Sequence, residues 1–314
     1  MKTAIVTGAT GFIGRALTKE LIQKNVTVYA LARNPSLVEK DAIPIQFDFD
    51  GPTDLENAIQ ENVDVFYHCA FVGGFDSAAI KDYNLQLRNA KISCDAVSLA
   101  AKTHAQKFVL ASTVNVEELL TFQGSTAFKP RYTCIYGAGK LAAELMGKTI
   151  AGNSGLDFCV ANIAMPYGEG NYARTLPNIV MEQLIRGISP RLIEGNNLYD
   201  LVYIQDVARA LFAIGESGKN FEDYYVGHTE LTTFRELMTN MRNVLSPETD
   251  LLFGEYPDTP SVDYGRIDLT KLYRDTGFLC ESDFALTVSS TAKWLSKSVN
   301  VENSCKNSGR GGNF

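Results

Sequence analysis

The segment Thr7-Gly8-Ala9-Thr10-Gly11-Phe12-Ile13-Gly14 lies near the start of the chain, between two patterns of different periodicity. Before it, Thr3 to Thr7 is a short run of β-branched and apolar residues, which predicts a buried strand. After it, Phe12 to Lys24 carries apolar residues at three- and four-residue spacing, which predicts an amphipathic helix. A glycine-rich turn that joins a strand to a helix is the setting in which the diphosphate of a dinucleotide is bound.

Each glycine of this segment has its own role in such a turn. Gly8 lets the chain turn sharply, Gly11 lets the backbone approach a pyrophosphate, and Gly14 lets the helix pack close to the strand. The amide groups at the start of the helix would then point at the anion. The alternative is a glycine-rich turn that binds nothing, but the position between a predicted strand and a predicted helix favours a dinucleotide site.

Short apolar runs alternate with helical patterns from Met1 to about Ile163, and this alternation predicts a parallel sheet. The expected strands are Thr3 to Thr7, Thr27 to Leu31, Pro44 to Phe47, Val63 to His68, Lys107 to Ala111 and Phe158 to Ile163. The expected helices between them are Phe12 to Lys24, Thr53 to Gln60, Asn84 to His104 and Tyr136 to Ala151. Six such strands are typical of a doubly wound α/β fold of the Rossmann type.

The strict alternation fades after Met165, where helical patterns are joined by long loops. The helices expected there are Leu176 to Arg186, Asp206 to Gly215, Thr233 to Leu245 and Asp283 to Ser296. We therefore expect a dinucleotide-binding Rossmann domain over residues 1–165 and a smaller α/β substrate-binding region over residues 166–297, interleaved with the first. Residues 298–314 are polar and are expected to form a disordered tail.

The composition excludes several classes of function. With 314 residues, 45% hydrophobic and 21% charged, the chain can bury a large core, and its net charge of -7 argues against nucleic acid or an anionic membrane as a partner. Six scattered cysteines without a Cys-x-x-Cys pair, and histidines that do not cluster, argue against a metal site and against a disulfide framework. No apolar run approaches the roughly 18 residues of a membrane span, and no signal peptide is recognisable. A small-molecule substrate and a cytoplasmic location are therefore expected.

The choice between NAD and NADP depends on the end of the second expected strand, about 20 residues after the glycine segment. NAD-binding chains carry an acidic residue there for the ribose 2′-hydroxyl, but no Asp or Glu lies between Lys24 and Val38. Arg33 could instead pair with the 2′-phosphate of NADP, which favours NADP, with a solvated loop charge as the alternative. Asp48, which precedes Phe49 after the third strand, is either an adenine contact or a capping residue.

Tyr136 and Lys140 open a predicted helix and lie one turn apart, on the same face. A phenol with a pKa near 10 is a poor base, but an ammonium group beside it favours the phenolate and allows proton exchange with a carbonyl or carbinol oxygen. The alternative is an ordinary surface helix. Ser112 and Thr113 follow a strand whose carboxyl end lies where such sheets bind ligands, so either hydroxyl could bind the substrate oxygen or simply end the strand. We expect a structural role for His68.

Taken together, these residues resemble an extended short-chain dehydrogenase/reductase of the NAD-dependent epimerase/dehydratase family, over about Met1 to Trp294. Further matches are His68-Cys69-Ala70, Asn84, Ala164-Met165-Pro166-Tyr167-Gly168, Val202-Tyr203-Ile204-Gln205-Asp206-Val207-Ala208 and Asp268-Leu269-Thr270-Lys271. The resemblance implies that Tyr136 exchanges the proton, that Lys140 binds the nicotinamide ribose and lowers the tyrosine pKa, and that Thr113 orients the substrate oxygen. It also implies a homodimer formed through the helices that begin near Asn84 and Tyr136.

The motifs and the resemblance together assign residues to two binding sites. The cofactor-binding residues are Gly8, Thr10, Gly11, Phe12, Ile13, Gly14, Arg33, Asp48, Phe49, Cys69, Ala70, Ala111, Tyr136, Lys140, Ile163 and Pro166. The substrate residues, by analogy with the nucleotide sugars common in the family, are Ser112, Thr113, Asn171 and Pro177, the last within Leu176 to Asn178.

The chain departs from the family pattern in ways that narrow the reaction. Thr113 is followed by Val114 and Asn115, whereas sugar dehydratases carry Asp-Glu there as acid and base, so dehydration is disfavoured. Val116-Glu117-Glu118 stands where Val-Tyr-Gly is usual. Tyr199-Asp200-Leu201 lacks the usual arginine that binds the substrate diphosphate, which weakens the expectation of a nucleotide sugar.

These observations predict an NAD(P)-dependent oxidoreductase that reduces a keto group, such as the 4-keto group of a nucleoside-diphosphate deoxysugar, with Tyr136 as proton donor. The first alternative is an NAD-dependent nucleotide-sugar 4-epimerase, which retains its cofactor through the cycle. The second is a dinucleotide-sensing protein without enzymatic activity, in which the Tyr136 and Lys140 pair has no chemical role.

Overall fold

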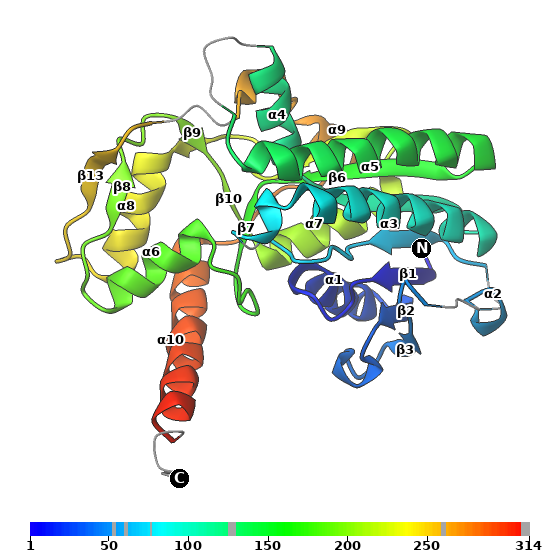
Figure 1. The fold of residues 1–314 in the computed structure, drawn as a ribbon, viewed down its shortest axis with the longest axis horizontal. Coiled ribbons are helices and arrows are strands. Elements are labelled where there is room, and N and C mark those ends of the chain that lie inside the picture. Colours follow the sequence, from blue (N-terminus) through cyan, green and yellow to red (C-terminus); the bar gives the residue numbers. More distant parts are fainter. Residues whose placement is uncertain (52–54, 60–61, 76, 125–129, 259–261, 309–314) are drawn as a thin grey trace.

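The computed structural model describes residues 1–51, 55–59, 62–75, 77–124, 130–258 and 262–308, apart from the side chains of residues 56–57 and 298–308. A parallel sheet of seven strands lies at its centre, in the order β11-β6-β5-β4-β1-β2-β3 (Figure 1). The strands are β1 (Thr3–Thr7), β2 (Thr27–Ala32), β3 (Ile43–Gln46), β4 (Val65–His68), β5 (Lys107–Thr113), β6 (Asp157–Ile163) and β11 (Asp223–Val226). The predicted doubly wound α/β fold and its six strands are confirmed. The sequence missed the seventh strand, β11.

Two layers of helices cover the sheet. On one face, α1 (Phe12–Gln23) packs beside α7 (Ile204–Ser217); on the other, α3 (Tyr83–Lys102) packs beside α5 (Thr133–Ser154). Because side chains alternate along a strand, β5 contributes Val109 to the first core and Phe108 to the second. A strand buried on both faces needs apolar residues throughout, which explains the uninterrupted apolar runs of the sequence.

The strand order reverses between β1 and β4, which are neighbours in the sheet although β2 and β3 lie between them in sequence. Thr7, at the end of β1, pairs in register with His68, at the end of β4. The loops after these two strands run to opposite sides, so a crevice opens at the carboxyl edge of the sheet, the usual ligand site of such folds.

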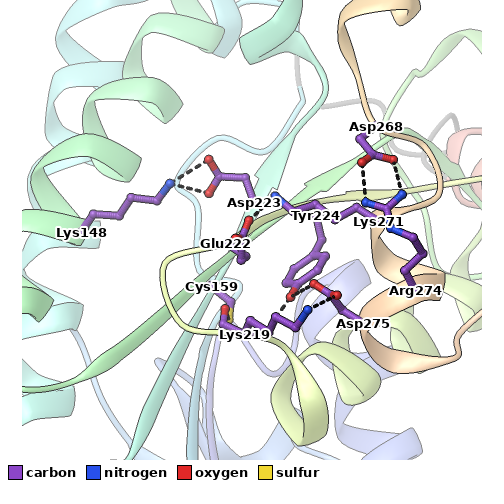
Figure 2. Close-up of polar contacts among 10 residues, drawn as sticks. All are labelled: Lys148, Cys159, Lys219, Glu222, Asp223, Tyr224, Asp268, Lys271, Arg274 and Asp275. Atoms are coloured by element: carbon purple, nitrogen blue, oxygen red, sulfur yellow. Dashed lines mark hydrogen bonds and ion pairs between the residues drawn. The ribbon is translucent and has the colours of Figure 1, made fainter.

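The elements α7 and β11 come from the region beyond residue 165, yet they complete the Rossmann unit. Elements from beyond residue 165 therefore contribute to the sheet and to one of its helical layers. The edge strand β11 is held by polar contacts to its neighbours (Figure 2). Lys148 of α5 bonds Asp223 at 2.7 Å, and the Tyr224 hydroxyl donates to Asp275 at 3.0 Å. Asp275 belongs to α9 (Lys271–Thr276) and also binds Lys219 at 2.6 Å.

A smaller region packs at one side of the sheet, where Figure 1 shows α6, α8, β8 and β13 together and α10 extending away from them. Its helices α6 (Leu176–Ile185), α8 (Phe234–Leu245) and α10 (Phe284–Ser308) share a core that includes Met181, Met238 and Val288. Its short strands are β7 (Met165–Tyr167), β8 (Arg191–Ile193), β9 (Leu198–Tyr199), β10 (Leu201–Tyr203), β12 (Thr232–Thr233) and β13 (Leu252–Tyr256). The backbone of residues 298–308 is helical as part of α10, where the sequence predicted a disordered tail, and residues 309–314 lie outside the described part.

The remaining elements are α2 (Leu55–Ala58), α4 (Asn115–Gln123) and 3₁₀ turns at Pro35–Leu37, Ala79–Lys81 and Tyr264–Arg266. Helix α4 was not expected, because its nine residues follow directly on a strand and carry little periodic pattern. Local capping sets other helix ends: Thr233 and Glu236 form a capping box at the start of α8, and Gly155 ends α5 in the left-handed conformation. No described helix is long and apolar enough to cross a membrane.

We expect Phe108→Ala to destabilise the fold by about 3–5 kcal/mol, because the substitution leaves a cavity in the core. The Phe108 ring is fully buried and stacks between Phe66 and Phe158, with centroid distances of 5.5 and 5.3 Å. Denaturant unfolding measures the loss. Leu286→Ala, on a side chain that is 71% exposed, is the control and should change the free energy of unfolding by less than about 0.5 kcal/mol. Equal losses in the two variants would contradict this account of the core.

Candidate active site

A cavity of about 890 Å³ lies at the carboxyl edge of the sheet and continues into the smaller region. It brings together most of the residues that the sequence assigned to the two binding sites: Thr10, Gly11, Phe12, Ile13, Gly14, Cys69, Ala111, Ser112, Thr113, Tyr136, Lys140, Ile163, Pro166 and Asn171. The other assigned residues do not line it: Gly8, Arg33, Asp48, Phe49, Ala70 and Pro177. Most residues of both predicted groups, for cofactor and for substrate, therefore face one continuous cavity.

The glycine turn has the geometry that a diphosphate needs. Gly8 has a φ of +67°, and a Cβ there would lie 2.7 Å from the amide nitrogen of Ala70. A Cβ on Gly14 would lie 2.2 Å from the Gly8 carbonyl oxygen, so helix and strand approach as closely as glycine allows. Helix α1 starts after Gly11 without a side-chain cap, which leaves its first amide groups directed at the cavity. These features fit a dinucleotide diphosphate.

Two cations of α1 extend this end of the cavity, and the sequence did not single them out. Arg15 and Lys19 line the cavity, and each lies 3.6 Å from the carboxylate of Glu39. Arg33 is exposed just beyond β2, outside the cavity wall. Asp48 is also exposed, and its carboxylate accepts a hydrogen bond from the Asp50 amide, as a turn residue does.

Tyr136 and Lys140 lie on the buried side of α5 and face the end of β5. The Lys140 ammonium donates to the Ala111 carbonyl at 2.7 Å, and burial lowers its pKa to about 8. Burial raises the pKa of the Tyr136 phenol, and interaction with the Thr113 hydroxyl partly offsets that rise. At neutral pH the phenol is protonated and the amine is charged, which suits a proton donor beside a fixed cation.

Two aromatic rings from the loop after β4 cover this pair. The rings of Phe71 and Phe75 meet the Tyr136 ring edge-on, at centroid distances of 5.2 and 5.4 Å. The Lys140 ammonium lies 4.3 Å from the centroid of Phe71. Gly73 and Gly74, both with positive φ, form the turn between the two rings. Sequence reasoning missed both rings, because only the fold brings this loop over α5.

The His68 side chain is structural, as expected. Its Nδ1 lies 2.8 Å from the Thr7 hydroxyl and its Nε2 lies 3.2 Å from the Ser93 hydroxyl. Full burial lowers the histidine pKa to about 3, so the ring is neutral. The ring ties β4 to β1 and α3 beneath the crevice.

A buried carboxyl group lies one turn beyond Lys140 on α5. Glu144 is 4% exposed and accepts a hydrogen bond from the Ser112 hydroxyl. Burial raises the pKa of the Glu144 carboxyl to about 7, and its charge in turn raises the pKa of Lys140. The four-residue spacing from Lys140 is a signal that could have identified Glu144 from the sequence.

A second buried carboxylate connects to Thr113. The Thr113 hydroxyl donates to the Asn115 side-chain oxygen at 3.0 Å, and the Asn115 side-chain nitrogen donates to Glu118 at 2.9 Å. Glu118 also accepts from Arg131 and from the Thr133 hydroxyl, each at 2.7 Å. This chain of hydrogen bonds joins α4 to the start of α5, and the unexpected helix α4 is what positions it.

The substrate half of the cavity carries Asn171 and the segment around Tyr199. Asn171 is buried, and its side-chain oxygen accepts from the Ala173 amide. Pro177 is buried in the first turn of α6 and stays outside the cavity wall. Asp200 accepts a hydrogen bond from the His228 ring at 2.7 Å, which raises the histidine pKa. Asp200 belongs to the segment Tyr199-Asp200-Leu201, in which the sequence lacks the usual arginine.

The sequence is similar to a known protein family and to curated enzymes. The family described as NAD dependent epimerase/dehydratase matches residues 4–227. Among curated proteins, the chain is 27% identical over 198 residues to dTDP-glucose 4,6-dehydratase 1 of Escherichia coli, which covers 60% of this chain and 54% of that protein. It is 24% identical over 331 residues to the dTDP-glucose 4,6-dehydratase of Neisseria gonorrhoeae, over 93% of this chain and 95% of that protein. The chain thus spans little more than half the length of the Escherichia coli relative.

Solved structures share the fold at lower identity. A UDP-glucose 4-epimerase from Thermotoga maritima, solved with UDP-glucose, superposes with a TM-score of 0.74 at 20% identity and covers 95% of this chain and 99% of its own. A UDP-glucuronic acid 4-epimerase from Bacillus cereus, solved with UDP-glucuronic acid and NAD, has a TM-score of 0.75 at 20% identity, over 94% of this chain and 99% of its own. At this identity the likeness establishes the architecture alone.

We expect Glu144→Gln to change how stability depends on pH. The folded-state pKa of this carboxyl is about 7, above its ordinary value of 4.5, so between these pH values the unfolded chain loses a proton that the folded chain keeps. The wild type therefore loses stability as pH rises through this window, whereas the glutamine variant does not. Relative to the wild type, the variant should gain about 1–3 kcal/mol between pH values of about 4 and 7.

Urea unfolding at several pH values in that range measures the effect. The range lies below the Lys140 pKa of about 8, which keeps the lysine out of the comparison. The control is Glu230→Gln, because Glu230 is exposed in the folded chain and should leave the pH profile parallel to that of the wild type. A Glu144→Gln profile parallel to the wild type would contradict the buried, protonated carboxyl.

Proposed function

Because the chain belongs to the NAD dependent epimerase/dehydratase family, we propose that it reduces the 4-keto group of a nucleoside-diphosphate deoxysugar, with Tyr136 as the proton donor. The observation that carries this proposal is the convergence of Tyr136, Lys140 and Thr113 at the carboxyl end of β5, in the same cavity as the glycine turn. The names of the relatives, which act on dTDP-glucose or bind UDP-sugars, support the substrate class.

Each residue of the site has its own role in the proposed reduction. A bound nicotinamide dinucleotide supplies the hydride to the carbonyl carbon. The Thr113 hydroxyl, which donates to Asn115 in this structure, turns to donate to the carbonyl oxygen. The Tyr136 O–H bond breaks as its proton moves to that oxygen, which gives a hydroxyl group and leaves a phenolate. Lys140, fixed by the Ala111 carbonyl, stabilises that phenolate. Phe71 and Phe75 exclude water above the ring of Tyr136.

The protonated phenol of Tyr136 is the form from which a reduction starts. Burial raises the Tyr136 pKa, so the phenol carries its proton at neutral pH and is ready to donate it. A dehydration would need an acid and a base beside Thr113, where Val114 and Asn115 stand. The carboxylate that approaches Thr113 through Asn115 is Glu118, and it is buried and paired with Arg131.

The alternative in the same family is a 4-epimerase, which the structural neighbours favour by their names. An epimerase oxidises and then reduces the same carbon with one tightly held NAD, so it consumes no reduced cofactor. A sensor without activity would need neither Tyr136 nor Lys140. Stoichiometric consumption of NADPH on anaerobic mixing with a 4-keto sugar nucleotide separates the reductase from both.

We expect Tyr136→Phe to lower kcat for this consumption by about 10²–10⁴-fold, because the variant has no proton to donate. Its affinity for NADPH, measured by fluorescence titration, should stay within about threefold of the wild type because the ring remains in place. The matched control is Tyr132→Phe, on an exposed tyrosine one turn earlier, which should keep the wild-type kcat. Unchanged turnover in Tyr136→Phe would support the sensor instead.

We propose NADP as the preferred dinucleotide. Arg33 follows β2, and Arg15 and Lys19 lie along the same side of α1, so several cations are available to a 2′-phosphate. Glu39, paired with Arg15 and Lys19, is the carboxylate that opposes this preference.

For Arg33→Ala we expect the Kd for NADPH to rise by about tenfold or more, with the Kd for NADH unchanged, because the 2′-phosphate alone loses a charged hydrogen bond. Binding titrations of both nucleotides give the two values. Arg186→Ala, at the exposed end of α6, serves as the control for lost surface charge. Equal effects on NADPH and NADH would count against a 2′-phosphate contact.

We also propose a homodimer through α3 and α5, which pack side by side. Tyr83 and Leu87 on α3 are 63% and 64% exposed, and Leu145 and Met146 on α5 are 58% and 46% exposed. Large apolar side chains exposed on two adjacent helices are typical of a surface that is covered in an assembly.

A further inference from the structure

The described wall of the cavity carries five cationic side chains, and their surroundings differ. Arg15 and Lys19 lie at the glycine-turn end, and Lys140 is buried against the Ala111 carbonyl. Arg131 and Arg191 remain for the substrate half. Among the cations of the wall, these two are the ones placed to meet a negatively charged substrate, because an anion taken out of water is stabilised by a charged hydrogen-bond partner.

Arg191 is poorly suited to this task. Two of its nitrogens, Nε and Nη2, donate to one oxygen of Glu255 at 3.0 and 2.6 Å, which occupies two of the guanidinium donors. Its side chain is 59% exposed, at the rim of the cavity. An anion there would compete both with Glu255 and with water.

Arg131 differs in both respects. Its Nε donates to Glu118 at 2.7 Å, which uses one of the five N–H donors of a guanidinium and fixes the plane of the group. Glu118 is 4% exposed, so the pair is anchored on a buried carboxylate, while the Arg131 side chain itself is 41% exposed along the cavity. The charge of Arg131 lowers the pKa of the Tyr199 phenol against the effect of burial, and both residues line the cavity.

Tyr199 belongs to the segment Tyr199-Asp200-Leu201, which lacks the expected diphosphate-binding arginine. The tyrosine lines the cavity from β9, and Arg131 lines the same cavity from the segment before α5. A cation that is missing from one element is therefore present on another that lines the same cavity.

Glu118 also connects Arg131 to the reacting centre. The Asn115 side-chain nitrogen donates to Glu118, and because only that end of an amide can donate, the Asn115 oxygen must point to Thr113. The Thr113 hydroxyl donates to that oxygen, which sets the orientation of the hydroxyl beside Tyr136. One carboxylate thus holds both the guanidinium and the amide that orients Thr113.

We propose that Arg131 binds the diphosphate of the substrate, and that Glu118 is a positioning residue that couples this recognition to the hydroxyl of Thr113. The inference rests on the proposed function, because it takes the substrate to be a nucleoside-diphosphate sugar. Arg131 then determines the affinity for the substrate, and Glu118 determines the turnover. Variants of these two contacting residues should therefore change different kinetic parameters.

The binding experiment uses the enzyme saturated with NADP⁺, so that added nucleotide cannot occupy the dinucleotide site. UDP and dTDP, each compared with its nucleoside, are titrated calorimetrically into the wild type, Arg131→Met, Arg131→Lys and the control Arg191→Met. We expect Arg131→Met to weaken diphosphate binding by about tenfold or more, Arg131→Lys to weaken it less, and nucleoside binding to stay unchanged. Arg191→Met should stay within about twofold of the wild type.

The kinetic experiment separates the two roles. Arg131→Met should raise KM by about tenfold or more with kcat within about threefold, whereas Glu118→Gln should lower kcat by about tenfold with a smaller change in KM. Bound NADPH and an unchanged circular dichroism spectrum confirm that each variant is folded. The inference is overturned if Arg131→Met binds the diphosphates as tightly as the wild type does. It is also overturned if Glu118→Gln keeps the kcat of the wild type.

Two other outcomes distinguish a failure of the Arg131 assignment from a failure of the proposed substrate class. If the wild type binds NADPH but neither UDP nor dTDP, the inference fails together with the proposed substrate class, while the dinucleotide chemistry of Tyr136 stands. If the wild type binds the diphosphates and Arg191→Met alone loses them, only the assignment to Arg131 fails.

Discussion

The close approach of Gly14 to Gly8 is the constraint on which the rest of the structure depends. A single methyl group on Gly14 would lie 2.2 Å from the Gly8 carbonyl oxygen, so the first turn of α1 is seated directly on the end of β1. This contact directs the uncapped amide groups of the helix into the crevice between β1 and β4. Helix α1, seated in this way, packs beside α7 on one face of the sheet.

Beyond that turn, the site contains ionisable groups that are buried, although burial disfavours their charged forms. Lys140, Tyr136 and Glu144 lie within two turns of α5, each less than one tenth exposed. Burial shifts all three towards their neutral forms, and the Ala111 carbonyl, Thr113 and Ser112 offset part of that cost with polar contacts. Perturbed groups gathered in a cavity are typical of a site shaped for proton transfer.

Short, specific hydrogen bonds tie α4 to the end of β5 and to the start of α5. Helix α4 begins two residues after Thr113, and its Glu118 accepts hydrogen bonds from Asn115 of the same helix and from Arg131 and Thr133 at the start of α5. A single buried carboxylate with several donors around it holds those segments in one arrangement, because losing any donor leaves the charge less satisfied. The geometry at the end of β5 is therefore tied to the wall that would meet the substrate.

The sequence by itself determined the features that are written locally: the strand, glycine turn and helix of residues 3–24, five further strands, and the one-turn spacing of Tyr136 and Lys140. These follow from periodicity and from the conformational freedom of glycine, which need no distant partner. Only the tertiary structure decided that β11 joins the sheet, that Phe71 covers Lys140, and that Glu118 links Arg131 to Asn115. Those contacts join residues far apart in the chain or on elements too short to carry a periodic pattern, so no local signal specifies them.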